Sequence, residues 1–378
     1  IAEHLNLFDE IYDSSSLINF KVSNKENLHE KVFGKRNFDY IGNSLKDIQI
    51  WGIANKAITF NVEKSLKRKC ELINSNTLHL VDTDKKGLLP SFLKEIRPYQ
   101  WIKNILIFIP LIAAQDFDKT TIFYAFLSFF SFSTTASSVY ILNDLLDIKA
   151  DRNHPIKCKR PFASGDLPLN LGSTLGILLL FLGLTIGFAV SKSFIAVLIT
   201  YYGITFSYSI YLKRKALVDI LILSGLYTLR LLAGSFATNV NISFWLLVFS
   251  IFIFLSLAAI KRQSELIDLK NRGKIKIENR GYSIKDLDFI RTLGISSGLI
   301  SILVLSLYLN SPKVLLLYSD PKFLWIACFF FLFWFIRVCL KTDRGEMKYD
   351  PLIFAFRDRV SNYIFLSIIL LLIFSNIS

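Results

Sequence analysis

Nine long apolar runs occupy most of the sequence from residue 97 onward, and they restrict the fold more than any other feature. Each run is as long, or nearly as long, as the ~20 residues that a helix needs to cross a bilayer. The first run is the weakest, because Lys103 and Pro110 interrupt it. We predict an all-α integral membrane protein with a bundle of nine transmembrane helices. The runs lie at about 97–115, 120–142, 170–190, 193–212, 216–236, 242–260, 291–309, 322–340 and 360–377.

Basic residues alternate from one side of these runs to the other. Segments 143–169, 213–215, 261–291 and 341–359 carry five, three, nine and five Lys or Arg, whereas the segments between them carry at most two each. Lys and Arg are enriched in the cytoplasmic loops of membrane proteins. The pattern predicts a protein of the inner or plasma membrane. Its N-terminus and the loops 143–169 and 261–291 would lie in the cytoplasm, with its C-terminus outside.

The composition agrees with a membrane protein. Of the 378 residues, 52% are hydrophobic, and the formal net charge is +14. A nucleic-acid-binding protein would carry such a charge on a separate polar domain, so we expect no nucleic-acid partner. The four cysteines lack metal-ligand spacing, which predicts reduced thiols. Because the first residue is Ile, we expect the sequence to be a fragment.

The residues before the first run have a different character. Residues 1–64 combine short β-rich runs with polar helical stretches and predict part of an α/β domain. We expect residues 65–92 to form a basic linker and residues 93–378 to form the membrane domain. Residues 38–47 resemble the C-terminal half of a haloacid-dehalogenase-like (HAD-like) hydrolase, whose acidic loop after a strand binds magnesium. The resemblance implies that Asp47 matches one metal ligand, but Asn43 replaces another, and the nucleophile would lie in a half that this sequence does not contain. We expect this segment to be catalytically inactive.

A charged stretch begins where the second run ends. Asp144, Asp147 and Asp151, with Asn143 beside them, would share one helix face if the helix continued through them. Such oxygen ligands suit a hard divalent cation that also takes phosphate oxygens. The alternative is a polar helix end followed by a solvated loop. The basic residues that follow suit the phosphates carried by such a metal, and they are Arg152, His154, Lys157 and Arg160.

We expect three further polar clusters at the same membrane face. Arg230 lies within an apolar run, where a charge needs an anion or a water-filled cavity. Lys213 has an alternative role as a topology determinant, and Lys261 and Glu265 have the spacing of an ordinary helix-surface ion pair. The clusters contain Lys103; Tyr208, Lys213 and Arg230; and Lys261, Arg262 and Glu265.

Residues 91–378 resemble the UbiA superfamily of intramembrane prenyltransferases, whose members have nine spans and an Asn-Asp-x-x-Asp-x-x-x-Asp motif after the second. Residues 143–151 match this motif completely. Two stretches resemble the decaprenyl-phosphate phosphoribosyltransferase branch of this superfamily. They are residues 151–165 (Asp-Arg-x-His-Pro-x-Lys-x-x-Arg-Pro-x-Ala-Ser-Gly) and residues 97–104 (Arg-Pro-x-Gln-Trp-x-Lys-Asn). A HAD-like module can precede the membrane domain in that branch.

The resemblance implies a reaction and its participants. A 5-phosphoribosyl group would pass from phosphoribosyl diphosphate to a polyprenyl phosphate, with release of diphosphate. Asp144 and Asp147 would be catalytic and would hold Mg²⁺ together with Asp151. Two alternatives stay open: a polyprenyl-diphosphate transferase for an aromatic or quinone-precursor acceptor, and a lipid or ion transporter. The substrate-binding residues would be Lys103, Asn143, Arg152, His154, Lys157, Arg160, Tyr208, Lys213, Arg230, Lys261, Arg262 and Glu265.

Overall fold

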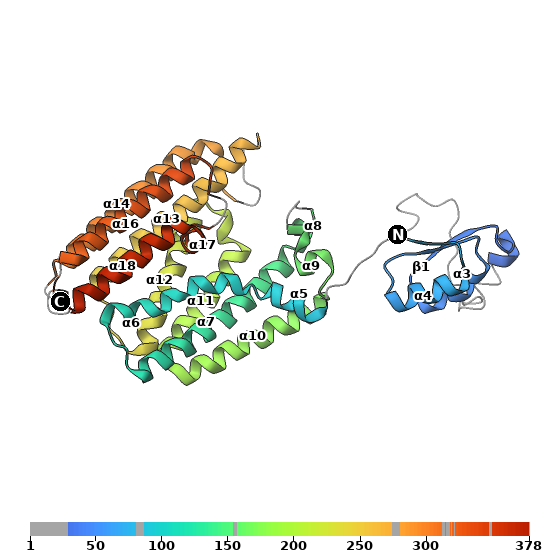
Figure 1. The fold of residues 1–378 in the computed structure, drawn as a ribbon, viewed down its shortest axis with the longest axis horizontal. Helices are drawn as coiled ribbons and strands as arrows, with labels where there is room; N and C mark the ends of the chain where they lie inside the picture. The colour runs from blue at the N-terminus through green and yellow to red at the C-terminus, as the bar shows by residue number, and fades with distance from the viewer. Residues whose placement is uncertain are drawn as a thin grey trace. The chain divides into compact units, whose positions relative to one another are not determined.

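The computed structural model of the chain describes residues 29–80, 87–153, 157–273, 280–311, 314, 318, 320, 322–347 and 350–377. It divides into two compact units, Ile1–Lys86 and Gly87–Ser378 (Figure 1). The first is a small α/β unit and the second is helical.

The α/β unit is built on a three-stranded parallel sheet in the order β1-β2-β3. Helix α3 (Ile48–Ile53) lies between β1 and β2 in the chain, and helix α4 (Lys64–Ile73) lies between β2 and β3. Apolar side chains of the helices pack on β2, and the core includes Trp51, Ala57 and Cys70. The sheet agrees with the α/β character expected here. The strands are Asp39–Gly42, Lys56–Thr59 and Thr77–His79.

The segment 65–92, expected to be a basic linker, is mostly folded. Helix α4 and strand β3 belong to the α/β unit, and helix α5 (Leu88–Glu95) belongs to the helical unit. Arg68 and Lys69 are exposed on α4, whereas Leu66 and Cys70 are buried. The charge run is therefore the solvent-facing side of an amphipathic helix. The boundary between the units falls after Lys86 rather than at residue 64.

Asp47 fixes the loop that follows β1. Its carboxylate accepts hydrogen bonds from the amides of Asn43 (3.0 Å) and Ser44 (2.9 Å) and from the Tyr40 hydroxyl (3.1 Å). Burial opposes ionisation of Asp47, but these donors outweigh it and lower its pKa. The carboxylate is thus engaged within its own loop.

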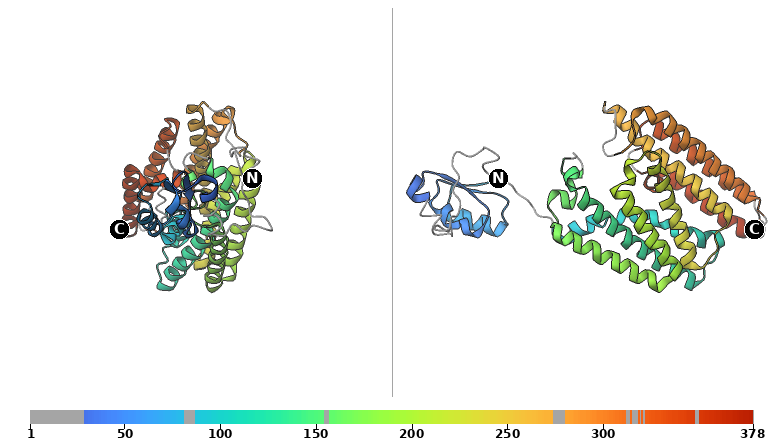
Figure 2. Two further views of the ribbon diagram at one scale, coloured as in Figure 1. Left: turned by 90° about the vertical axis from the view of Figure 1, so that its right-hand side faces the viewer. Right: turned by 180° about the vertical axis from the view of Figure 1, so that it is seen from behind.

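The second unit is a bundle of long helices (Figures 1 and 2). Within it α7 packs along α10, α12 packs against α11 and α13, α13 packs along α14, and α16 packs against α18. The helices are α5, α7 (Lys119–Leu146), α8 (Ile148–Arg152), α9 (Pro161–Ser164), α10 (Leu169–Val190), α11 (Lys192–Ile210), α12 (Val218–Thr238), α13 (Phe244–Asn271), α14 (Leu287–Leu309), α16 (Lys322–Asp343), α17 (Pro351–Arg357) and α18 (Arg359–Ile377). Short 3₁₀ turns cover Lys157–Lys159, Leu212–Arg214 and Ile284–Asp286.

In the described part of the chain, seven helices are long and apolar enough to cross a membrane, or eight if α17 and α18, bent by 82°, form one span. The first predicted run is instead the 3₁₀ helix η2 (Pro98–Phe108) followed by the short helix α6 (Ile109–Ala114). Proline lacks an amide hydrogen and fits the first turn of a helix, so a new helix begins beside Pro110. The helical membrane class is confirmed, but the count of nine is not.

Small residues bring the helices together around the site. Ser131 of α7 donates a hydrogen bond to the Gly183 carbonyl of α10 (2.7 Å), a close approach of the kind that small residues allow in membrane bundles. Ser137 of α7 donates to the Ile96 carbonyl (2.7 Å) and accepts from Trp101 Nε1 (3.0 Å). Ser137 therefore anchors the segment that leads into η2.

Candidate active site

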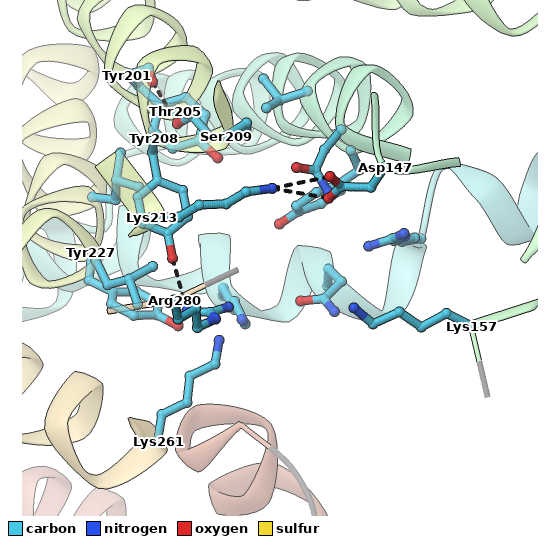
Figure 3. A pocket seen from close by; sticks show the side chains of 18 of the residues that line it. Asp147, Lys157, Tyr201, Thr205, Tyr208, Ser209, Lys213, Tyr227, Lys261 and Arg280 are labelled. Carbon is cyan, nitrogen blue, oxygen red and sulfur yellow. Dashed lines mark hydrogen bonds and ion pairs between the residues drawn. The ribbon is translucent and has the colours of Figure 1, made fainter. Parts of the chain in front are cut away.

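A polar cavity of about 390 Å³ is lined by η2, by the C-terminal parts of α7 and α11, and by α12. Figure 3 shows its side chains, with Lys213 extending to Asp147 and Tyr208 pointing toward Arg280. Among the described residues, the lining has eight basic side chains and two carboxylates, Asp147 and Asp151. This excess of positive charge favours anionic ligands. The basic residues are Arg97, Lys103, Lys157, Arg160, Lys213, Arg230, Lys261 and Arg280.

The three aspartates of the 143–151 stretch do not lie on one continuous helix. Helix α7 ends at Leu146, and Asp147 occupies the break before α8. Asp147 lies 3.0 Å from Lys213 Nζ, with its side chain 34% exposed. Asp144 and Asp151 are both buried. Because of the break, Asp147 is partly exposed and contacts Lys213, whereas Asp144 and Asp151 are buried.

Arg160 bridges the two buried aspartates. Its Nη1 atom lies 2.9 Å from Asp144 Oδ1 and 2.6 Å from Asp151 Oδ2. Two carboxylates thus surround one cationic nitrogen, an arrangement that a divalent cation could take over together with substrate oxygens. Within the described residues, no group of three His, Cys, Asp or Glu side chains is positioned to hold a metal ion.

Arg97 has a strained backbone beside this pair. Its φ angle of 52° is left-handed, and such a conformation at a non-glycine residue costs on the order of 1–3 kcal/mol and occurs often at functional sites. The Arg97 guanidinium donates a hydrogen bond to Asp144 and lies 5.5 Å from the centre of the Tyr140 ring. Burial opposes the charge of Arg97, but Asp144 outweighs burial and raises its pKa.

Glu95, the last residue of α5, is a further carboxylate close to Asp144. It is 1% exposed, and neither of its oxygens has a hydrogen-bond donor among the described residues. Burial, followed by the charge of Asp144, raises the pKa of Glu95 to about 8. A hydrogen bond between the two carboxyl groups forms when one of them is protonated. Glu95 was not predicted from the sequence, where its one signal is a charge just before an apolar run.

A second polar cluster involves Lys103 of η2 and Lys261 of α13. Their Nζ atoms lie 2.9 and 3.1 Å from the same Oδ2 atom of Asp350. The Tyr227 hydroxyl lies 3.4 Å from both Asp350 oxygens. Burial opposes ionisation of Asp350, but Lys261 and Lys103 hold its pKa well below the usual range. Asp350 was not predicted from the sequence, because it lies outside every apolar run and motif.

Arg230 lines the cavity from α12, as its place within an apolar run suggested. Its Nε donates to Asn104 Oδ1 (2.8 Å), and its Nη1 donates to the Leu226 carbonyl (2.5 Å). The guanidinium also lies 5.1 Å from the centre of the Tyr201 ring and 5.4 Å from that of Tyr227. Aromatic faces stabilise a cation that is withdrawn from water.

Arg262 lies in a buried ion network. Its side chain is fully buried, donates to Asp219 (3.1 Å) and contacts Glu265. Arg280 lines the cavity and lies 3.4 Å from Asp219. Arg280 was not predicted as a site residue, because the sequence does not show which cation of the 261–291 loop packs against the bundle.

The structure brings together most of the predicted site residues. Asp144 lies behind the lining, between Arg97 and Arg160. Arg262 and Glu265 belong to the buried network, and Arg152 is exposed. His154 lies outside the described residues. The cavity is lined by Lys103, Asn143, Asp147, Asp151, Lys157, Arg160, Tyr208, Lys213, Arg230 and Lys261.

A helical membrane bundle around a cavity rich in cations, with an Asp-rich stretch at its wall, suits a membrane enzyme that binds anionic substrates. The UbiA prenyltransferase family matches residues 105–360, and the chain belongs to this family. The predicted class of enzyme is therefore confirmed.

Relatives extend the comparison along the chain. An uncharacterized protein, y4nM, of Sinorhizobium fredii is 33% identical over 372 residues, which are 96% of this chain and 70% of the relative. The nodulation protein NoeC of Azorhizobium caulinodans is 31% identical over 75% of this chain and 92% of its own length. A decaprenyl-phosphate phosphoribosyltransferase of Mycolicibacterium smegmatis is 30% identical over 75% of this chain and 91% of its own length.

Solved structures share the fold. A UbiA homolog from Archaeoglobus fulgidus bound to GPP and Mg²⁺ superposes with a TM-score of 0.57 at 13% identity, over 75% of this chain and 99% of that chain. A structure described as digeranylgeranylglyceryl phosphate synthase has a TM-score of 0.51 at 18% identity, over 77% of this chain and 99% of that chain. At such low identity these likenesses show the fold alone.

Proposed function

We propose that this chain transfers a 5-phosphoribosyl group from phosphoribosyl diphosphate to a polyprenyl phosphate and releases diphosphate. The observation that carries the proposal is the described cavity lining, whose eight cations outnumber its two carboxylates and the four carboxylates that pair with them from behind, Asp144, Asp219, Glu265 and Asp350. The two substrates of this reaction bring a diphosphate and two phosphate monoesters, whose repulsion fixed Lys and Arg side chains offset. The relative from M. smegmatis, named for this activity, adds support.

The residues present fit a divalent cation such as Mg²⁺. Asp144 and Asp151, which both contact Arg160 Nη1, would hold the cation. Asp147, which also lines the cavity, would assist them. Bound there, the cation would neutralise charge that develops on the leaving diphosphate. Arg160 then has to move from the carboxylates toward the diphosphate, which its long side chain permits. The Mg²⁺-bound A. fulgidus homolog supports a metal in this family.

The chain's own groups would bind and orient both substrates. Lys157 and Arg160 lie beside Asp151, where they would hold the diphosphate. Lys213, which lies 3.0 Å from Asp147 and lines the cavity, would also contact the donor. The bond between the anomeric carbon and a diphosphate oxygen breaks, and a lipid phosphate oxygen forms the new bond to that carbon. An ionised phosphate needs no base to remove a proton, so departure of diphosphate is the step to assist.

The network around Arg262 supports a positioning role rather than contact with substrate. Arg262 holds Asp219, and Asp219 lies beside Arg280, which lines the cavity. We assign anion contact on this wall to Arg280 and Lys261. Glu265, which contacts Arg262, would complete the support.

We also propose that the membrane domain has nine spans. The helical stretch Pro98–Ala114 would form the first span, and the bent pair α17–α18 the last. The alternation of basic segments supports an active site on the cytoplasmic face, with the N-terminus inside and the C-terminus outside. The α/β unit would be an inactive HAD-like module, because Asp47 is engaged within its own loop and Asn43 has no charge to offer a metal.

One alternative has support of its own. The aromatic rings around Arg230 would also suit a prenyl-diphosphate transferase with an aromatic acceptor. To separate the two, purified protein is incubated with labelled phosphoribosyl diphosphate and polyprenyl phosphate, with and without Mg²⁺, and the lipid product is analysed. We expect a ribosylated lipid that depends on Mg²⁺. Prenylation of 4-hydroxybenzoate without ribosylated lipid would overturn the proposal, and binding without turnover would favour a transporter.

A further inference from the structure

Two lysines from different helices meet on one carboxylate beside the cavity. The side chains of Lys103, Asp350 and Lys261 are 11%, 9% and 30% exposed, so most of the cluster is withdrawn from water. Both lysines line the cavity. Asp350 is the N-cap of α17, where its Oδ1 accepts a hydrogen bond from the Leu352 amide (3.2 Å). The backbone therefore fixes the carboxylate on which both lysines depend.

The lysines keep capacity for a further anion. An ammonium group has three N–H donors, and the contact with Asp350 uses one donor of each lysine. Without an anion between them, two neighbouring ammonium groups repel each other. Asp350 offsets this repulsion before any ligand arrives. The two lysines can therefore stay side by side at the cavity, where a phosphate can reach them.

We propose that Lys103 and Lys261 form a subsite for a phosphate monoester, and that Asp350 is the positioning residue that holds both ammonium groups toward the cavity. The inference rests on the proposed function, whose two substrates each carry a phosphate monoester: the lipid phosphate, and the 5-phosphate of the donor. The lysine pair serves one of these groups, and the carboxylate-rich wall near Arg160 serves the diphosphate.

The test compares Asp350→Asn with wild type in two binding arms, polyprenyl phosphate alone and phosphoribosyl diphosphate alone. Affinity is measured directly in detergent, and the Michaelis constant for each substrate is measured in parallel. We expect the affinity for one of the two to fall about 10-fold or more, the size of a lost charge-assisted hydrogen bond, and the other to stay within about 2-fold. The substrate whose affinity falls is the one whose phosphate monoester binds to the lysine pair. Asp350→Glu, which keeps the charge, should restore part of the lost affinity.

Asp358→Asn is the matched control. Asp358 lies between α17 and α18, pairs with Arg337 at 2.5 and 3.0 Å, and has a side chain 13% exposed, so its loss removes a comparable ion pair. It should leave both affinities unchanged. Unchanged or tighter binding of both substrates by Asp350→Asn, or equal weakening of both, would overturn the inference. If wild type binds both substrates but forms no ribosylated lipid, the proposed function fails. The two binding measurements would still show which phosphate the lysine pair binds.

Discussion

The three aspartates of the 143–151 stretch have different surroundings, so they should not be interchangeable. Asp144 is held between the guanidinium groups of Arg97 and Arg160. Asp147 faces Lys213 at the cavity wall, and Asp151 shares Arg160 with Asp144. Asp147 and Asp151 line the cavity, whereas Asp144 lies behind the lining and is paired with two arginines.

Asp144→Asn and Asp147→Asn should each lower turnover by roughly 100-fold or more, because each removes charge from the cation-binding region and alters little packing. Turnover is measured at saturating Mg²⁺, with thermal unfolding as a check on folding. Asp268→Asn is the control, since Asp268 forms an exposed ion pair with Arg272. A turnover near that of wild type in either variant would place the metal elsewhere.

Glu95 predicts a pH dependence of stability. Its pKa is raised to about 8 in the folded chain, whereas an unfolded glutamate titrates near ~4.3. The folded state therefore binds the proton more tightly, and stability from this group is full below the unfolded pKa and is lost as pH rises through about 8. In metal-free buffer, the unfolding temperature of wild type should fall between pH 6 and 8. Glu95→Gln should lessen that fall, and parallel curves for the two proteins would contradict the assignment.

At the residue scale, the sequence predicted which types of side chain line the cavity but not how they pair. The Asn-Asp-x-x-Asp-x-x-x-Asp pattern identified Asn143, Asp147 and Asp151, because the density of charge beside an apolar run is visible without a structure. Glu95, Arg280 and Asp350 were missed. Each acquires its role from a partner far along the chain, and the sequence shows no such pairing.

At the scale of elements, the contact between α12 and η2 holds the η2 side chains against the cavity. A Cβ atom at Gly234 would lie 2.0 Å from the Ile107 carbonyl oxygen, so the two backbones touch at a point where only glycine fits. One turn away, Arg230 donates to Asn104 of η2. Close packing and this hydrogen bond together position Lys103.

Gly234→Ala should destabilise the fold by about 1–3 kcal/mol, because a methyl group would force η2 away from α12. It should also weaken substrate binding, since Lys103 moves with η2. Gly225→Ala on the same helix is the matched control, as a Cβ there meets no atom within 4 Å. Thermal unfolding and the Michaelis constants are compared for both variants. Equal stability of the two would show that the backbones do not touch.

The elements themselves were predictable to different degrees. Long apolar runs predicted α7, α10, α11, α12, α13, α14 and α16, because length and hydropathy are properties of a single segment. The division of the first run into η2 and α6 was not predicted, although Pro110 was noted as an interruption. The folding of residues 65–92 was missed because a solvated helix face and a basic linker have similar compositions.

At the scale of the whole molecule, the two units divide the chain after Lys86, and all lining residues in the described part of the chain belong to the second. The match to the UbiA prenyltransferase family also falls within residues 105–360. Domains with their own core can fold independently. The transferase activity should therefore reside in the second unit.

A chain of residues 87–378 should insert into membranes and keep turnover within about 3-fold of the full chain, since truncation removes no group of the cavity. Product formation is measured for both chains, with Asp147→Asn in each as the inactive control. Loss of turnover in a truncated protein that folds would show that the α/β unit takes part in catalysis.

The charge imbalance of the cavity also acts before any substrate has touched it. Among the described residues, the eight cations of the lining outnumber its two carboxylates and the four that pair with them from behind. The remaining positive potential attracts a soluble anion over a Debye length of ~10 Å at 0.1 M salt. Capture of the donor should therefore be fast and sensitive to ionic strength. In stopped-flow experiments, added salt should slow association of phosphoribosyl diphosphate markedly and change its dissociation little. At low donor concentration, the rate of encounter rather than the strength of binding would then limit turnover.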